Sequence, residues 1–141
     1  MPINFFTEEL PFSLKEKRKR KAWLKKIAES ENHTIEELNY VFCSDDYLLN
    51  INVEYLDHDT YTDIITFDNS EDEGVIEGDI FISIERVKEN SRTLKVTEEK
   101  ELSRVISHGL FHLLGYKDKS KAEASLMRSK EELAIKLFEE I

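Results

Sequence analysis

The chain has 141 residues, which is enough for one domain with a buried core, and its net charge is −10. Apolar residues make up 40% of the chain and charged residues 35%, with four glycines and two prolines, which excludes a low-complexity or disordered chain. The acidic balance argues against a protein that coats nucleic acid by bulk electrostatics, because most of the surface would repel phosphates. We therefore expect a single domain over residues 1–141, in which any contact with nucleic acid uses a local basic patch.

The predicted elements begin with a strand at residues 3–6 and a helix that opens at Ser13, because Ser13 and Glu16 have the spacing of a capping box. This helix carries the basic cluster, residues 15–26, which contains eight lysines and arginines and a single acid. A solvated helix face is the simplest interpretation of such a charge run. If the cluster instead contacts phosphate, the candidate residues in its centre are Arg18, Lys19 and Arg20.

A second strand is expected at residues 38–43, followed by a helix with Ser44 as its N-cap. Two further strands are expected at residues 64–67 and 80–82, which are short β-prone runs without clean alternation and are therefore predicted to be buried on both faces. The acidic segment 68–77 is the predicted connection between them. Cys43, the only cysteine, lies in an apolar run and is expected to pack as a small hydrophobic residue.

The remainder of the chain has a helical pattern, with one helix at residues 84–90 and a second from its N-cap Thr97 to Leu114. Ser120 begins a second capping box, which opens the last helix. Apolar residues of the helix at 97–114 point in several directions, which places that helix centrally. Strands lead and helices finish, which predicts an α+β fold with a small central mixed sheet of about four strands and helices packed around it.

His108 and His112 are four residues apart, so both project from one helix face and can bind one metal ion. Gly115 stands where a left-handed residue ends a helix and turns the chain back. Asp118 then completes the pattern His-x-x-x-His-x-x-Gly-x-x-Asp, which has the spacing of the extended zincin motif. Because two nitrogens and one carboxylate oxygen leave a fourth position for water, we predict one Zn²⁺ per chain. The same ligands suit Fe(II), so another divalent metal is an alternative.

Gly109 stands where related metalloproteases carry a glutamate as general base, which disfavours a peptidase mechanism. A glycine in mid-helix costs about 0.5–1 kcal/mol relative to alanine, so we expect a packing or ligand-access reason for it. The candidate bases are then Asp63 and Asp79, which precede the two apolar strands and which also suit strand-end caps or turns. His33 and His58 are interpreted as surface histidines.

Residues 108–116, His-Gly-Leu-Phe-His-Leu-Leu-Gly-Tyr, resemble the His-Gly-x-x-His-Leu-x-Gly-Tyr signature of the YbeY family of bacterial endoribonucleases and ribosomal RNA maturation factors. Two more blocks agree with that family in order and spacing. They are the residues from Leu49-Asn50 through Tyr55 and Asp59 to Thr62–Phe67, and Gly78–Ser83. The resemblance implies a single zincin-like α+β domain, a zinc ion on the signature helix, and metal-assisted cleavage of RNA in maturation and quality control of the small ribosomal subunit.

The chain departs from the family pattern beside the signature. The third ligand of the family is usually a histidine in Gly-Tyr-Asp-His, whereas here Asp118 replaces that histidine and Lys117 replaces the acid before it. An anionic ligand should weaken the Lewis acidity of the metal. Many members also carry arginine where this chain has Leu56, so His58 or a lysine is the candidate to supply that positive charge.

The predicted metal site together with the family resemblance favours a metal-dependent endoribonuclease, with metal-activated water as the nucleophile, and the resemblance implies single-stranded ribosomal RNA as the substrate. The basic residues expected to engage phosphate are Lys117, Lys119, Lys121, Arg18, Lys19 and Arg20. The alternative is a ribosome-assembly factor with a structural metal, whose basic helix docks on RNA or on a small-subunit protein. A zinc hydrolase of another substrate is a third hypothesis. No signal peptide and no run of roughly 18 apolar residues is present, so we expect a cytoplasmic protein with no membrane partner.

Overall fold

The computed structural model describes residues 2–56 and 62–141. Its strands form a 4-stranded mixed sheet in the order β1-β2-β4-β3. The parallel pairs are β1 with β2 and β2 with β4, while β3 runs antiparallel to β4. The strand bounds are β1 (Ile3–Glu8), β2 (Thr34–Cys43), β3 (Ile64–Asp68) and β4 (Val75–Ser83).

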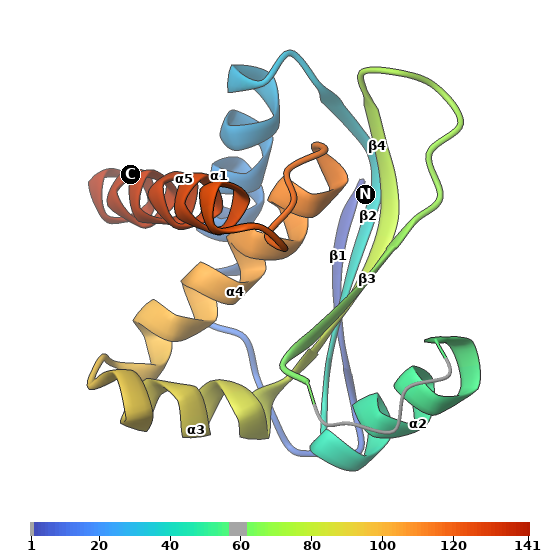
Figure 1. The fold of residues 1–141 in the computed structure, drawn as a ribbon, viewed down its shortest axis with the longest axis vertical. Helices are drawn as coiled ribbons and strands as arrows, with labels where there is room; N and C mark the ends of the chain where they lie inside the picture. Colours follow the sequence, from blue (N-terminus) through green and yellow to red (C-terminus); the bar gives the residue numbers. More distant parts are fainter. Residues whose placement is uncertain (1, 57–61) are drawn as a thin grey trace.

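The helices of the described residues gather mainly on one face of this sheet. Figure 1 shows α1, α4 and α5 on that face, with α2 on the other side of the sheet near one end. The arrangement confirms the predicted α+β fold with a small mixed sheet. The helix bounds are α1 (Lys17–Ser30), α2 (Asp45–Leu56), α3 (Ile84–Leu94), α4 (Glu98–Leu113) and α5 (Lys121–Glu140).

Two apolar cores form because alternate side chains of the strands point to opposite faces. The larger core lies between the sheet and the helices α1, α4 and α5, and its fully buried members include Trp23, Leu24, Tyr40, Phe42, Ile80 and Ile106. The smaller core lies between the opposite face and α2, and is built from Cys43, Leu48, Ile51 and Ile65. Burial raises the pKa of the Cys43 thiol to about 12, in keeping with its predicted packing role.

Three predicted helix starts are confirmed by side-chain caps. Ser44 accepts a hydrogen bond from the backbone N–H of Tyr47 at 3.1 Å, and Thr97 accepts one from that of Lys100 at 3.1 Å. Ser120 forms the full capping box at the start of α5. The helix expected at 84–90 continues to Leu94. In the described part of the chain, none of these helices has the length and apolar character needed to cross a membrane.

The start of α1 differs from the prediction. Glu16 adopts a left-handed conformation with φ of 57° and ψ of 44°, and the helix begins only at Lys17, without a side-chain cap. Leu14 is buried in the larger core, so the residues before Lys17 pack across that core instead of continuing the helix. The capping-box spacing of Ser13 and Glu16 was therefore misleading.

The strands also differ from their predicted bounds. β2 begins at Thr34, because its polar first residues pair with Val75–Glu77 and extend the ladder into the segment predicted to be a loop. β3 continues to Asp68, which pairs with Gly78. The prediction that both apolar strands are buried on both faces is wrong. β4 lies inside the sheet, with one face buried and the other partly buried, and β3 is an edge strand.

Candidate metal centre

Gly109 allows α4 to lie close against the sheet. A Cβ atom at this position would lie 2.8 Å from Ile80 Cδ1 and 3.1 Å from Ile64 Cδ1, which is closer than packed side chains tolerate. The expected packing reason for a mid-helix glycine is therefore found in the sheet beneath it. A glutamate here would have to displace the side chains of Ile80 and Ile64, and the general base of the related metalloproteases is not present at this position.

Gly115 ends α4 in the way that the sequence predicts. Its φ of +103° lies in the left-handed region, and no atom of residues 2–56 or 62–141 lies within 4 Å of the point that a Cβ would occupy, so backbone conformation alone favours glycine here. The N–H of Gly115 donates to the carbonyl of His112 at 3.0 Å, and the N–H of Tyr116 donates to that of Phe111 at 3.0 Å. This pair of bonds is a Schellman motif, which reverses the chain after the second histidine.

The chain after this turn is tied to two helices. The Tyr116 hydroxyl donates to Glu31 Oε1 at 2.8 Å, and Lys130 Nζ donates to Glu31 Oε2 at 3.0 Å. Glu31 directly follows α1, and Lys130 belongs to α5. The turn is thus held between α1 and α5, which fixes the path of the residues that lead to Asp118.

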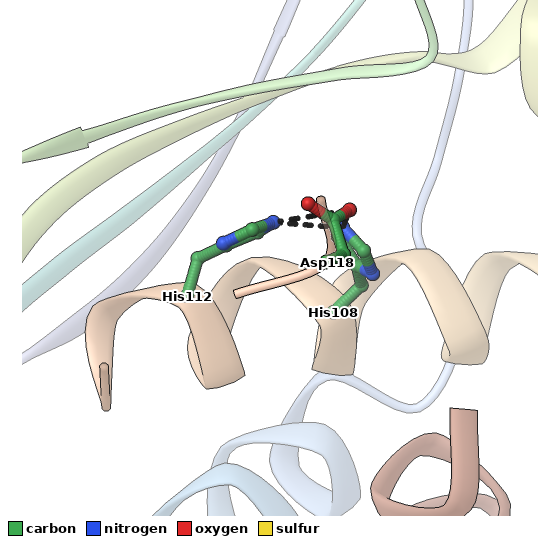
Figure 2. Close-up of side chains that lie close together, drawn as sticks. All are labelled: His108, His112 and Asp118. Carbon is green, nitrogen blue, oxygen red and sulfur yellow. Dashed lines mark hydrogen bonds and ion pairs between the residues drawn. The ribbon is translucent and has the colours of Figure 1, made fainter. Parts of the chain in front are cut away.

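The two histidines of α4 and Asp118 come together above the helix, and Figure 2 shows the three side chains pointing toward one another. His108 Nε2 lies 3.0 Å from His112 Nε2 and 3.3 Å from Asp118 Oδ2, and His112 Nε2 lies 3.6 Å from that oxygen. Ligand atoms about 2.0–2.2 Å from a tetrahedral ion are separated by roughly 3.3–3.6 Å. Two of the three observed distances lie in this range and the distance between the two histidine nitrogens is about 0.3 Å shorter, so the three side chains are close to the spacing of three ligands of one metal ion.

Burial of the site favours the neutral form of His112, which is the form that binds metal. Burial lowers the pKa of the His112 imidazole, and the adjacent His108 lowers it further. Asp118 is more exposed, with 41% of its side chain accessible, and it lies on the outer side of the cluster. The group therefore has one accessible side, as a site that receives a substrate requires.

Comparison with known proteins places this chain in a family. The family model described as "Endoribonuclease YbeY" matches residues 3–139. The chain belongs to the YbeY endoribonuclease family. It is 54% identical to endoribonuclease YbeY of Cytophaga hutchinsonii over 135 residues, covering 96% of this chain and 94% of that protein. It is 51% identical to endoribonuclease YbeY of Flavobacterium psychrophilum over 133 residues, covering 94% of each chain.

The fold agrees with a solved structure as well. The solution structure of the Thermotoga maritima protein TM1509 aligns with a TM-score of 0.66 at 27% identity, covering 96% of this chain and 88% of that one. The predicted resemblance to the YbeY family is confirmed. Because the curated relatives are endoribonucleases, which are hydrolases that act on RNA, the predicted class of enzyme is confirmed for the family to which the chain belongs.

A buried ionic network beneath the YbeY signature helix was missed by the sequence reasoning. His108 Nδ1 lies 2.5 Å from Glu131 Oε2, and Arg104 donates to Glu131 Oε1 at 3.1 Å. Burial alone would raise the pKa of Glu131, but the hydrogen bond from His108 and the charge of Arg104 outweigh burial and lower it. The sequence does contain one indication of this network. Helical spacing places four polar residues on one face of α4, namely Glu101, Arg104, His108 and His112.

Two cavities adjoin the three candidate ligands. One of about 280 Å³ is lined by His108 and Asp118 together with Asp63, Arg104, Arg128 and Glu131. A second of about 660 Å³ is lined by His112 together with Leu56, Thr66, Asp68 and Lys119. The ligands thus border two hollows, one lined also by residues of α5 and one lined also by residues of the edge strand β3.

Only one of the two candidate aspartates lies at this site. Asp63 lines the smaller cavity with His108, and burial raises the pKa of its carboxyl, although Arg104 and His108 partly oppose that effect. Asp79 lies within β4, where its neighbour Ile80 faces α4, so the Asp79 side chain points to the opposite face. There it accepts a hydrogen bond from Asn39 at 3.0 Å. The structure therefore corrects the assignment of Asp79 as a candidate base.

The basic residues predicted to contact phosphate divide into three sets. Lys117, Lys119 and Lys121 are exposed on both sides of Asp118, and Lys119 lines the cavity with His112. Arg18 and Lys19 lie on α1, where Lys19 Nζ sits 4.2 Å from the centre of the Phe138 ring. Phe138 is about two helical turns, roughly 10 Å, beyond Glu131 along α5. Lys19 therefore contacts a part of α5 that is displaced from the residue that contacts His108.

Arg20 does not belong to a phosphate-binding surface. It is 0% exposed, and its guanidinium donates to the Lys15 carbonyl at 3.0 Å, to Ser103 Oγ at 3.1 Å and to Glu99 Oε2 at 2.8 Å. These bonds join α1 to the first turns of α4, so the predicted role of Arg20 is corrected to a structural one. Outside the metal group, His33 contacts the carbonyl of Glu31, and His58 lies outside the described residues.

Proposed function

We propose that this protein is a metal-dependent endoribonuclease that cleaves single-stranded ribosomal RNA during maturation of the small subunit. The observation that carries the proposal is the convergence of His108, His112 and Asp118 in a chain of the YbeY family. The family supports the reaction class, and the ligand group supports its dependence on metal. The specific substrate is supported by the family resemblance of the three sequence blocks.

The donor set fits a zinc ion, because two imidazole nitrogens and one carboxylate oxygen are ligands that zinc accepts. His108, His112 and Asp118 would hold the ion. When bound, such an ion supplies Lewis-acid chemistry, lowering the pKa of water and polarising a phosphoryl oxygen. Where the family usually has histidine, Asp118 adds a negative charge, so we expect retained metal binding with weaker Lewis acidity.

We assign proton transfer and phosphate binding to residues that line the two cavities. Asp63 accepts a proton beside the ligands, since its half-buried carboxyl faces the same cavity as His108. Lys119 contacts a substrate phosphate, since it lines the cavity that His112 borders. Leu56 lines that cavity too, so Lys119 is the lysine that compensates for the arginine many family members carry at position 56.

An RNA strand crossing from one cavity to the other would pass over the three ligands and between the lysines that flank Asp118. Those lysines supply local positive charge on a chain whose net charge is −10. Binding through a small local patch has a shallow dependence on salt, because few counterions are released.

The test compares wild-type protein with His112→Ala, Asp118→Ala and the control His33→Ala. Each sample is analysed for zinc content and for cleavage of single-stranded ribosomal RNA. We expect His112→Ala to lose both zinc and cleavage, Asp118→Ala to lose most of the zinc, and His33→Ala to match wild type.

Cleavage that persists in metal-free protein would contradict the proposal. If the ligand variants instead keep ribosome association and the wild type cleaves nothing, the assembly-factor hypothesis is favoured. In that case replacement of Lys19 and Lys25 on α1 should weaken the association.

A further inference from the structure

A group of three charged side chains lies buried under the candidate metal ligands. Glu101 and Glu131 are each 1% exposed, and the Arg104 side chain between them is 17% exposed. Arg104 donates to Glu101 Oε1 at 2.9 Å and to Glu131 Oε1 at 3.1 Å. Buried charges are costly unless each is paired and hydrogen-bonded, and in this group Arg104 satisfies both carboxylates.

Glu131 uses its two oxygens for different partners. Oε1 accepts from Arg104, and Oε2 lies 2.5 Å from His108 Nδ1. Because an ionised carboxylate only accepts hydrogen bonds, this contact requires a hydrogen on His108 Nδ1. In the neutral ring, the lone pair is then on Nε2, which is the atom that faces His112 and Asp118.

The second histidine is held in another way. His112 is hydrogen-bonded to the backbone of Tyr116, in the turn that follows α4. The turn after α4 therefore helps to orient this ring, whose Nε2 lies beside His108 and Asp118. His108 lies in the middle of α4, and the side chain that reaches its Nδ1 comes from α5.

We propose that Glu131, itself fixed by Arg104, is a positioning residue that holds His108 in its Nδ1-protonated tautomer with Nε2 directed at the metal. The inference rests on the proposed metal centre and adds the residue that orients one of its ligands. A carboxylate that receives the second N–H of a ligating histidine also increases the basicity of the ligating nitrogen. Glu131 therefore contributes to metal affinity without contacting the ion.

The test measures zinc binding by competition with a chromophoric chelator, using wild type, Glu131→Gln and the control Glu132→Gln. Glu132 is the exposed neighbour on α5, so its substitution makes the same change in charge and size. We expect Glu131→Gln to weaken zinc affinity about 10- to 100-fold, as loss of such a partner does in other metal sites. Glu132→Gln should leave the affinity unchanged.

A spectroscopic measurement reads the tautomer directly and needs no variant that destabilises the protein. In wild type labelled with ¹⁵N, the ring nitrogens of His108 should show a protonated Nδ1 in the zinc-loaded protein. Protonation at Nε2, or Glu131→Gln affinity equal to wild type, would overturn the inference while leaving the metal centre intact. Wild type that binds no zinc would instead overturn the proposed function and this inference with it.

Discussion

At the scale of single residues, Gly109 and Gly115 are both required, but for different physical reasons. Gly109 has an ordinary helical backbone, and its missing side chain lets α4 approach Ile80 and Ile64. Gly115 has open space around it, and its positive φ is what a larger residue would resist. One glycine thus sets the depth of the helix against the sheet, and the other directs the chain toward Asp118.

The two candidate aspartates allow a matched prediction at the same scale. We expect Asp63→Asn to reduce RNA cleavage by roughly 10²–10⁴-fold, which is the usual contribution of a general acid or base. Zinc content should stay the same, because Asp63 lines the cavity without belonging to the ligand group. Asp79→Asn, on the opposite face of the sheet, is the control in a single-turnover cleavage assay. Equal loss of cleavage in both variants would argue against Asp63 as the base.

At the scale of the elements, the end of α1, the turn after α4 and the middle of α5 meet at Glu31. Burial alone would raise the pKa of Glu31, but hydrogen bonds from Tyr116 and Lys130 lower it below the ordinary value of 4.5. A depressed carboxyl pKa stabilises the fold above the unfolded pKa, and this stabilisation disappears as pH falls through the folded value. This contact therefore ties the three elements most strongly near neutral pH.

Glu31→Gln should test that tie. Because the Glu31 side chain is 22% exposed, solvent screening limits its contribution, and we expect a loss of about 1 kcal/mol in the free energy of unfolding at neutral pH. The difference from wild type should shrink as pH falls below 4.5 and disappear below the lowered pKa of the folded state, where the wild-type carboxyl takes up its proton. Urea unfolding across this range measures both effects, with the exposed Glu29→Gln as control. A constant difference at every pH would show that charge is not the cause.

At the scale of the whole molecule, the candidate ligands join α4 to the loop before α5, so metal binding and folding should be linked. A ligand at 100 times its dissociation constant stabilises the native state by about 2.7 kcal/mol. For a chain of this size we expect zinc to raise the thermal midpoint by about 5–10 °C. Scanning calorimetry with and without chelator measures this shift of the thermal midpoint. A His108→Ala and His112→Ala double variant should show no response, and an equal response would place the zinc elsewhere.

The features that could be predicted from the sequence are local ones. His108 and His112 share a helix face by their spacing alone, and Gly115 and Asp118 follow within six residues of His112. The caps at Ser44, Thr97 and Ser120 depend on hydrogen bonds within three residues. The same reasoning failed at Ser13, where burial of Leu14 outweighed a capping pattern, and at Thr34, where pairing with β4 outweighed a polar composition.

The sequence by itself determined the family, the α+β class and the three candidate metal ligands, because each depends on short-range spacing or on a quoted motif. Only the tertiary structure decided which distant side chains complete the site. Glu131 reaches His108 because α5 packs on α4, Asp63 lines the same cavity as that histidine, and Asp79 is turned away by strand alternation. Arg20 shows the same limit, since a basic residue of a charged run became a buried tie between two helices. Such contacts join residues far apart in the chain, and only the packing of helices on a sheet brings them together.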